Sequence, residues 1–261
     1  MSVVSEERKR IILENLEVKG KVKVADLAEK FSVSTETIRR YLEDLDKNQK
    51  LKKVYGGAVK NDPPSLIEPS MVERKILNIE KKKRIAYKAA TFIQNGDVIL
   101  VDEGSTTLQL VPYLMHIKEL TIITNSFPFA NQLISATNNK MFTGEIVFIG
   151  GTISPQHFRT AGPMSQQILT HLSFDRAFIS VDALLPDFGI SSYNLEKAKL
   201  SEMMINQAGK TYVLADHSKI GLKGTYKITE LNKIDYILSN QPLSKAWEGH
   251  LLENDVKWIH C

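Results

Sequence analysis

The chain has a single cysteine, Cys261, at the last of its 261 positions. One thiol forms no internal disulfide and makes no zinc site, which excludes disulfide scaffolds and fits a reducing compartment. Long hydrophobic runs are also missing, because runs such as VILV at 98–101 fall far short of the roughly 20 residues that a membrane span needs. The charged start MSVVSEERKR lacks the apolar segment of a signal peptide. These absences predict a cytoplasmic protein with no membrane partner.

Motifs for cofactors, metals and catalysis are equally scarce. The six histidines, His157 and His217 among them, show no metal-ligand spacing. The sequence has neither the lysine-bearing loop of a nucleoside triphosphatase nor the triple glycine of a dinucleotide-binding fold. We therefore predict no cofactor, no metal and no catalytic residue.

What is present is an ordinary globular composition with an uneven charge distribution. Hydrophobic residues make up 43% and charged residues 25% of the chain, and the net charge is +4. Residues 1–60 contain 14 Lys and Arg against 10 Asp and Glu, so they carry the whole excess. A positive block confined to a short N-terminal region is expected where a small domain meets a polyanion. The length favours two domains.

The first 60 residues predict a winged helix-turn-helix domain. Amphipathic patterns indicate a helix at 5–17, a short strand around Val22 and Val24, and a second helix ending near Phe31. A third helix follows Ser34 as N-cap. Residues 50–60 read as a β-hairpin, with Gly56 and Gly57 supplying positive φ angles in its turn.

The exposed face of the third helix suits the major groove of DNA. Arginines pair with guanine or hold phosphates, threonines contact phosphate or a thymine methyl, and lysines on the hairpin contact the backbone. The alternative is an ordinary solvated helix and hairpin. The candidate DNA-binding residues are Ser34, Thr35, Thr37, Arg39, Arg40, Lys50, Lys52 and Lys53.

After a proline-rich linker at 61–70, residues 71–261 predict an α/β domain with a parallel sheet covered on both faces. A long helix is expected at 73–93. Helical patterns at 105–115, 126–137, 162–172 and 194–209 alternate with candidate strands at 98–102, 120–124, 145–150, 176–182, 211–216 and 235–239.

Polar loops follow several of these strands and are expected to converge at one edge of the sheet, where open parallel sheets bind ligands. Small hydroxyl residues and backbone N–H groups in such loops can hold a phosphate, for which Lys219 is the candidate cation. The alternative is that glycine and serine merely cap the turns. The candidate effector-binding residues are Asp102, Glu103, Gly104, Ser105, Thr106, Thr124, Asn125, Ser126, Gly150, Gly151, Asp182, Glu196 and Lys219.

The run TIRRYLEDLDKNQKLKKVYGGAV at 37–59 resembles the DNA-binding signature of the DeoR family of bacterial transcriptional regulators. The family's sensor domain pattern is similar to Asp102–Thr106, Thr124–Ser126, Gly150-Gly151, Asp182 and Asp216–Lys219. The chain departs at Tyr41 and Gln49, where the family commonly has Asp and Gly. It also departs at Ser180, Ala183 and Ser201, where Gly, Gly and Lys are common.

The resemblance implies a sensor domain similar to ribose-5-phosphate isomerase that binds a phosphorylated sugar. The expected function is a regulator, most simply a repressor of a sugar-metabolism operon, that binds double-stranded operator DNA as a homodimer or homotetramer. Two rivals are a sugar-phosphate isomerase that uses Glu103, Asp182 or Glu196 as base, and an architectural DNA-binding protein. Fusion to a DNA-binding domain favours sensing over turnover.

Overall fold

The computed structural model describes residues 3–19, 21–48, 50–60 and 68–261, and the chain divides into two compact units, Met1–Ser65 and Leu66–Cys261. The predicted linker therefore lies mostly outside the described residues, which resume at Glu68. Among the described residues, no helix combines the length and the apolar character that crossing a membrane requires.

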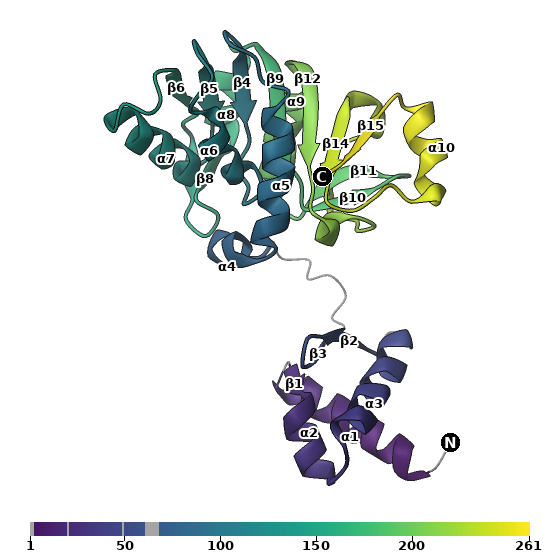
Figure 1. The fold of residues 1–261 in the computed structure, drawn as a ribbon. Helices are drawn as coiled ribbons and strands as arrows, with labels where there is room; N and C mark the ends of the chain where they lie inside the picture. The colour runs from purple at the N-terminus through teal and green to yellow at the C-terminus, as the bar shows by residue number, and fades with distance from the viewer. Residues whose placement is uncertain (1–2, 20, 49, 61–67) are drawn as a thin grey trace. The chain divides into compact units, whose positions relative to one another are not determined.

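The N-terminal unit has the predicted winged helix-turn-helix arrangement (Figure 1). Ser32 closes α2 with a left-handed φ of 50°, and Ser34 opens α3 as its N-cap, so the turn between the helices spans only a few residues. Ile12, Ile38 and Leu42 are among the side chains that form its core. The elements are α1 (Val3–Lys19), β1 (Lys21–Lys23), α2 (Val24–Phe31), α3 (Thr35–Lys47), β2 (Leu51–Val54) and β3 (Gly57–Lys60).

The wing is a three-stranded antiparallel sheet in the order β1-β3-β2, and its two glycines differ in role. Only Gly56 has the predicted positive φ, 78°. The prediction of a positive φ at Gly57 was wrong. A Cβ at Gly57 would lie 2.0 Å from the main-chain oxygen of Val22, so this glycine permits close approach of β3 to β1 instead.

The C-terminal unit is built on a seven-stranded sheet in the order β15-β14-β12-β9-β4-β5-β6, with every neighbouring pair parallel. This confirms the predicted α/β class. Its elements are α4 (Met71–Ile76), α5 (Ile79–Ala90), β4 (Val98–Val101), η1 (Thr107–Leu110), α6 (Val111–Leu114), β5 (Thr121–Thr124), α7 (Phe127–Asn138), β6 (Glu145–Phe148), β7 (Thr152–Ser154), β8 (Arg159–Ala161), α8 (Pro163–Leu169), β9 (Phe174–Ser180), β10 (Ala183–Leu185), β11 (Gly189–Ser192), α9 (Leu195–Asn206), β12 (Ala208–Leu214), η2 (His217–Lys219), β13 (Tyr226–Thr229), η3 (Leu231–Lys233), β14 (Tyr236–Ser239), α10 (Lys245–Glu253) and β15 (Lys257–His260).

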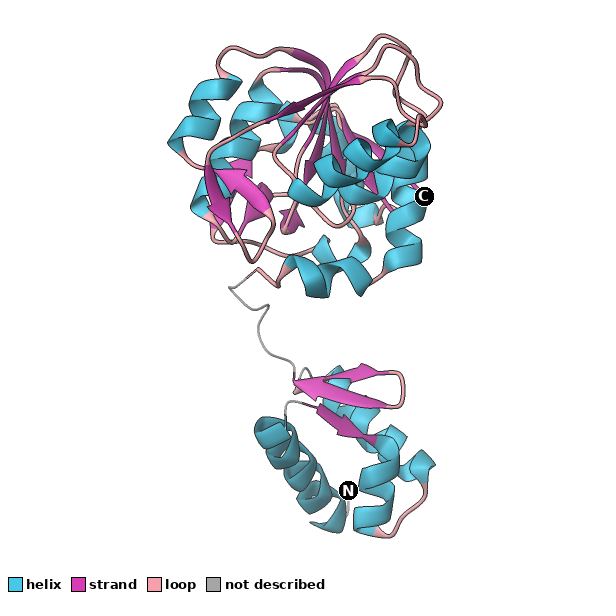
Figure 2. Cartoon of the chain, turned by 90° about the vertical axis from the view of Figure 1, so that its left-hand side faces the viewer, coloured by secondary structure: helices cyan, strands magenta, loops and turns pink. Residues whose placement is uncertain are grey.

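Helices cover both faces of this sheet (Figure 2). Successive residues of a strand point to opposite faces, so Val101 packs into the core shared with α5, α6 and α7. Leu100 packs into the other core, which α8, α9 and α10 complete. Apolar side chains on two faces explain why the strands read as nearly continuous hydrophobic runs.

Two features of the C-terminal unit differ from the sequence predictions. The long helix expected at 73–93 is two helices, because Asn78 adopts a left-handed φ of 56° between α4 and α5. The edge strand β15 and the short strands β7, β8, β10, β11 and β13 were not predicted. The break at Asn78 matters because it turns α4 away from α5 and across the end of the sheet.

The strand order places a switch point between β4 and β9. The chain runs from β4 to β5 and β6 on one side, and β9, β12, β14 and β15 lie on the other. Ligands of open parallel sheets bind outside the carboxyl ends of the strands at such a point. We therefore expect a ligand-binding site at the loops that follow β4, β9 and β12.

Candidate functional site

In the N-terminal unit, α3 presents a polar face above a buried stripe. Ser34 Oγ accepts a hydrogen bond from the Thr37 amide at 3.2 Å and lies 2.9 Å from Thr37 Oγ1, so both hydroxyls take part in capping. Thr35, Arg39 and Arg40 are exposed. Arg39 has a loose, exposed ion pair with Glu36 at 3.4 Å, which competes little with a phosphate.

The wing adds a second cationic surface. Lys50 precedes β2, and Lys52 and Lys53 lie on it with exposed side chains. Tyr55, at the turn, is fully exposed and was missed by sequence reasoning, although an aromatic residue between a lysine-bearing strand and a glycine turn is a usable signal. Tyr41 points the other way and is buried against the unit's core. The departure at Tyr41 therefore affects packing of α3.

In the C-terminal unit, a cavity of about 200 Å³ opens at the carboxyl ends of β4, β9 and β12, beside the switch point. Ser105 and Thr106 reach it from the loop after β4, and Lys219 reaches it from η2. The structure thus brings these three predicted residues together. Its other lining residues are Pro69, Arg74, Leu77, Asn78, Lys82, Ser180, Val181, Leu214, Asp216 and Ser218.

Two lysines in this pocket carry charges that burial makes costly. Burial lowers the pKa of Lys82 to about 8, although Asp216 at 3.9 Å opposes the shift. Burial also lowers the pKa of Lys219, again against the attraction of Asp182 and Asp216. A bound anion would relieve both penalties, because an opposite charge nearby favours the protonated lysine.

Behind the pocket lies a buried cluster of charges, which we call the ion cluster. It pairs Arg74, Arg159 and Lys197 with the carboxylates of Glu68, Glu103 and Asp182. Glu103 accepts from Arg159 Nη1 at 2.5 Å and from Arg74 Nη2 at 3.3 Å. Lys197 Nζ lies 3.0 Å from Asp182 Oδ1. Since each cation has a carboxylate partner, the cluster is close to neutral.

The ion cluster sets the protonation of the predicted carboxylates. Burial alone would raise the pKa of Glu103, but Arg74, Lys197 and Arg159 outweigh it and hold that pKa well below its usual range. Asp102 is less well paired, and burial raises its pKa to about 7. Its carboxyl group accepts a hydrogen bond from Ser201 at 3.1 Å. A base with a lowered pKa suits proton abstraction poorly, which disfavours isomerase chemistry at Glu103.

Several other predicted effector residues support the loops. Thr124 donates to the main chain of Val101, Ser126 caps α7, and Asn125 bridges the Glu103 amide and the Thr160 carbonyl. A Cβ at Gly104 would lie 2.2 Å from Ser180 Oγ, so the glycine admits that serine. Direct contact of these residues with an effector stays a prediction.

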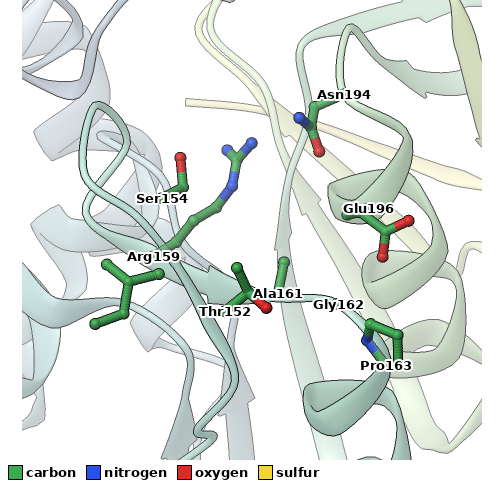
Figure 3. A pocket seen from close by; sticks show the side chains of 9 residues that line it. Thr152, Ser154, Arg159, Ala161, Gly162, Pro163, Asn194 and Glu196 are labelled. Carbon is green, nitrogen blue, oxygen red and sulfur yellow. The ribbon is translucent and has the colours of Figure 1, made fainter.

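Glu196, Gly150 and Gly151 lie away from Lys219. Gly151 has a φ of 143°, and a Cβ there would lie 2.0 Å from Ser165 Oγ. Glu196 lines a second cavity of about 240 Å³ between the β7–β8 hairpin and α9. Figure 3 shows Arg159 and Asn194 extending into this space from its two sides. The structure therefore separates Glu196 from the pocket that holds Lys219.

Two family models match this chain with their domains in the observed order. Residues 8–63 match the DeoR-like helix-turn-helix domain, and residues 77–241 match the DeoR C terminal sensor domain. The chain belongs to the DeoR family. It is a DNA-binding transcriptional regulator and not an enzyme.

Relatives of this DeoR-family protein agree with that assignment. The HTH-type transcriptional regulator YulB of Bacillus subtilis is 32% identical, covering 96% of this chain and 95% of that protein. The putative aga operon transcriptional repressor of Escherichia coli O157:H7 is 32% identical over 90% of this chain and 86% of that protein. A D-ribose-5-phosphate isomerase in complex with phospho-erythronic acid is 20% identical over 55% of each chain with a TM-score of 0.39, too low to add to the fold assignment.

Sequence reasoning missed most of the charged residues around the pocket of this DeoR-family protein. Lys82 lies within the lysine run of α5, and Lys197 directly follows Glu196, so both had a weak signal. Lys197 lies one helical turn before Ser201, where the family commonly has Lys, and reaches Asp182. Glu68 and Arg159 had no signal, because only the tertiary fold brings them together.

Proposed function

We propose that this regulator is a repressor of a sugar-metabolism operon whose operator affinity is controlled by a phosphorylated sugar bound in the pocket of Lys82 and Lys219. The observation that carries the proposal is the pair of lysines, both with lowered pKa values, next to the hydroxyls of Ser105 and Thr106 at the switch point. The aga operon relative, a putative repressor by name, supports the polarity.

A phosphoryl group fits this pocket better than a neutral sugar does. Of the charged lining residues, Lys82 and Lys219 face one carboxylate, Asp216, while Arg74 is already paired in the ion cluster. Lys82 is buried and Lys219 is half-buried, so their surplus positive charge is costly unless an anion neutralises it. Asp102 and Glu103 lie beneath the same loop and would orient the sugar only through Ser105, Thr106 and the main chain.

On the DNA side, α3 would enter the major groove with Thr35, Arg39 and Arg40, and the lysines of β2 would hold the backbone. One short helix reads too few bases for specific affinity, so the functional form would be a homodimer or homotetramer on a symmetric operator. Such a regulator would act in the cytoplasm, where its operator and its phosphorylated effector both occur.

The test measures binding to labelled DNA from upstream of the protein's own gene, at fixed salt, with a panel of sugar phosphates and the matching free sugars. We expect one phosphorylated sugar to weaken DNA binding by about 5- to 150-fold, the range of typical allosteric coupling, and its free form to have no effect. Lys219→Ala should remove the response while Lys245→Ala, a change at an exposed lysine of α10, keeps it. Specific DNA binding that no member of the panel alters would refute the effector half of the proposal.

A further inference from the structure

Glu68, the first described residue after the linker, is fixed inside the ion cluster. Both of its carboxylate oxygens accept from Arg159 Nη1, at 3.1 and 3.0 Å, and Oε1 lies 3.0 Å from Arg74 Nη2. Lys197 Nζ and His157 Nδ1 each lie 3.6 Å from the same oxygen. Only 4% of Glu68 is exposed. This carboxylate is held firmly, because moving Glu68 out of the ion cluster would leave buried cations without a partner.

The segment that Glu68 begins is also one wall of the effector pocket. Pro69, Arg74, Leu77 and Asn78 line the cavity, which is four of the eleven residues of Glu68–Asn78. Lys82, which also lines the pocket, donates from Nζ to the main-chain oxygen of Arg74 at 2.6 Å. Further anchors are the capping box of Ser70 and Glu73, and Met71, whose amide donates to Gln156. The pocket and the segment therefore share Arg74 and Lys82.

Arg74 lines the cavity and has one donor whose hydrogen bond is not satisfied within the described part of the chain. Its Nη2 contacts Glu68 and Glu103, yet its Nε is buried and has no hydrogen-bond partner among the residues that the structure describes. An unsatisfied buried donor beside a cavity costs free energy, which an oxyanion in the pocket would recover. Arg74 therefore adjoins the cavity and, through Nη2, also contacts Glu68.

We propose that the segment Glu68–Asn78, which we call the docking segment, couples the pocket to the DNA-binding unit: an anionic effector completes the contacts of Arg74 and so holds Glu68 in the ion cluster. The inference rests on the proposed function and adds its route of regulation. An effector that binds only the docked arrangement stabilises it by a free energy that rises with the logarithm of ligand concentration once that concentration exceeds Kd. Occupancy of the pocket then determines whether the chain that leads to the wing is anchored at Glu68 or only beyond Asn78.

The chain between the units is short enough for this to matter. Residues 61–67 separate Lys60, the last residue of β3, from Glu68. At about 3.4 Å per residue they span at most roughly 27 Å, whereas release of the whole docking segment would extend the tether to roughly 65 Å. Two wings of an oligomer on one operator have an effective concentration that depends on tether length. Docking would thereby change DNA affinity with no new contact to DNA.

Hydrogen exchange of the full-length wild-type protein tests the docking directly, with inorganic phosphate as the probe and chloride at equal ionic strength as the control. We expect amides of residues 70–78 to exchange several-fold more slowly in phosphate, while those of α10, far along the chain from the pocket, stay unchanged. Calorimetry on the same samples reports whether phosphate binds. Binding without slower exchange in 70–78 overturns this inference and leaves the proposed function standing, whereas no binding overturns both.

Glu68→Gln weakens the docked arrangement itself. We expect residues 70–78 of this variant to exchange faster than in wild type in chloride, and the variant to bind phosphate more weakly, because docking and binding favour each other. Its DNA affinity should no longer respond to the phosphorylated sugar that shifts the wild type. Glu248→Gln, at an exposed site on α10, is the matched control and should behave as wild type. A variant that is folded, binds phosphate and keeps the full DNA response would contradict the proposal. If Glu68→Gln does not fold, the exchange measurement on the wild-type protein alone tests the proposal.

Discussion

The two units of this regulator use charge in opposite ways. On the N-terminal unit, Arg39, Arg40 and the wing lysines are exposed, with loose partners such as Glu36. In the C-terminal unit, Arg74, Arg159 and Lys197 are 5% exposed or less and each contacts at least two carboxylates. Exposed charges are available to a polyanion and sensitive to salt, whereas buried ones fix geometry and select a small anion. This difference is what we expect of a chain in which one unit binds DNA and the other binds a small effector.

The sharpest test of this contrast is a matched pair of arginine substitutions. Arg159→Met removes a buried cation that contacts both Glu68 and Glu103, so we expect the C-terminal unit to lose about 3–5 kcal/mol of unfolding free energy. Arg40→Met removes an exposed charge and should leave the stability of its unit almost unchanged. Urea denaturation followed by circular dichroism measures both. Equal losses would mean that the ion cluster is no more important to folding than the surface.

In DNA binding, we expect Arg40→Met to have a larger effect than Arg159→Met, the reverse of their order in stability. Arg40→Met is expected to weaken specific operator binding by about 1–3 kcal/mol if it contacts a base, or to reduce the salt dependence by about one ion if it contacts a phosphate. Fluorescence anisotropy at several salt concentrations distinguishes the two results. Lys30→Met, at an exposed position of α2, is the control for nonspecific loss of charge. An unchanged affinity for Arg40→Met would remove α3 as the recognition helix.

The smallest effect concerns pH. Because the pKa of Lys82 is lowered to about 8, the lysine loses its proton as pH rises through that value, and affinity for a phosphorylated effector should fall about tenfold between pH 7 and 9. Lys82→Arg keeps its charge over this range and should flatten the profile. Calorimetric titration at a series of pH values makes the comparison. A wild-type affinity that is constant from pH 7 to 9 would show that Lys82 does not bind the anion.

Features that depend on residues close together in the sequence could be predicted, whereas features that depend on distant residues could not. The α3 cap and the parallel strands were predictable, because Ser34 acts three residues along the chain and strands such as 98–101 carry their own apolar pattern. The break between α4 and α5 was not predictable, because residues 73–93 have the pattern of one continuous helix, which is interrupted only by the extended backbone of Leu77 and the left-handed φ of Asn78. Ser105, Thr106 and Lys219 were predicted from loop chemistry and line one cavity, while their contact with an effector stays a prediction.

The ion cluster could not be predicted because its residues are far apart in the sequence. Glu68 and Arg159 are 91 positions apart and meet only after the sheet has formed. Glu68 also lies beside prolines that predict a linker, so its local sequence argues against a buried role. Asp182 was predicted, but its partner Lys197 was not. The neighbouring Glu196 was chosen as a candidate instead, and Glu196 lines a different cavity. Long-range pairs of this kind leave no periodic pattern in one sequence.

The contact between Gly104 and Ser180 has a consequence for how this pocket can diversify. The missing side chain of one loop makes room for the hydroxyl of the other, so the two positions share a single volume. Ser180 lines the cavity, and Lys82 and Lys219 lie on other elements. An exchange of bulk between positions 104 and 180 would reshape this part of the cavity while leaving both cations in place. Under the proposed function, sugar preference and the requirement for a phosphate would therefore depend on separate residues, and descendants of one regulator could change the first without losing the second.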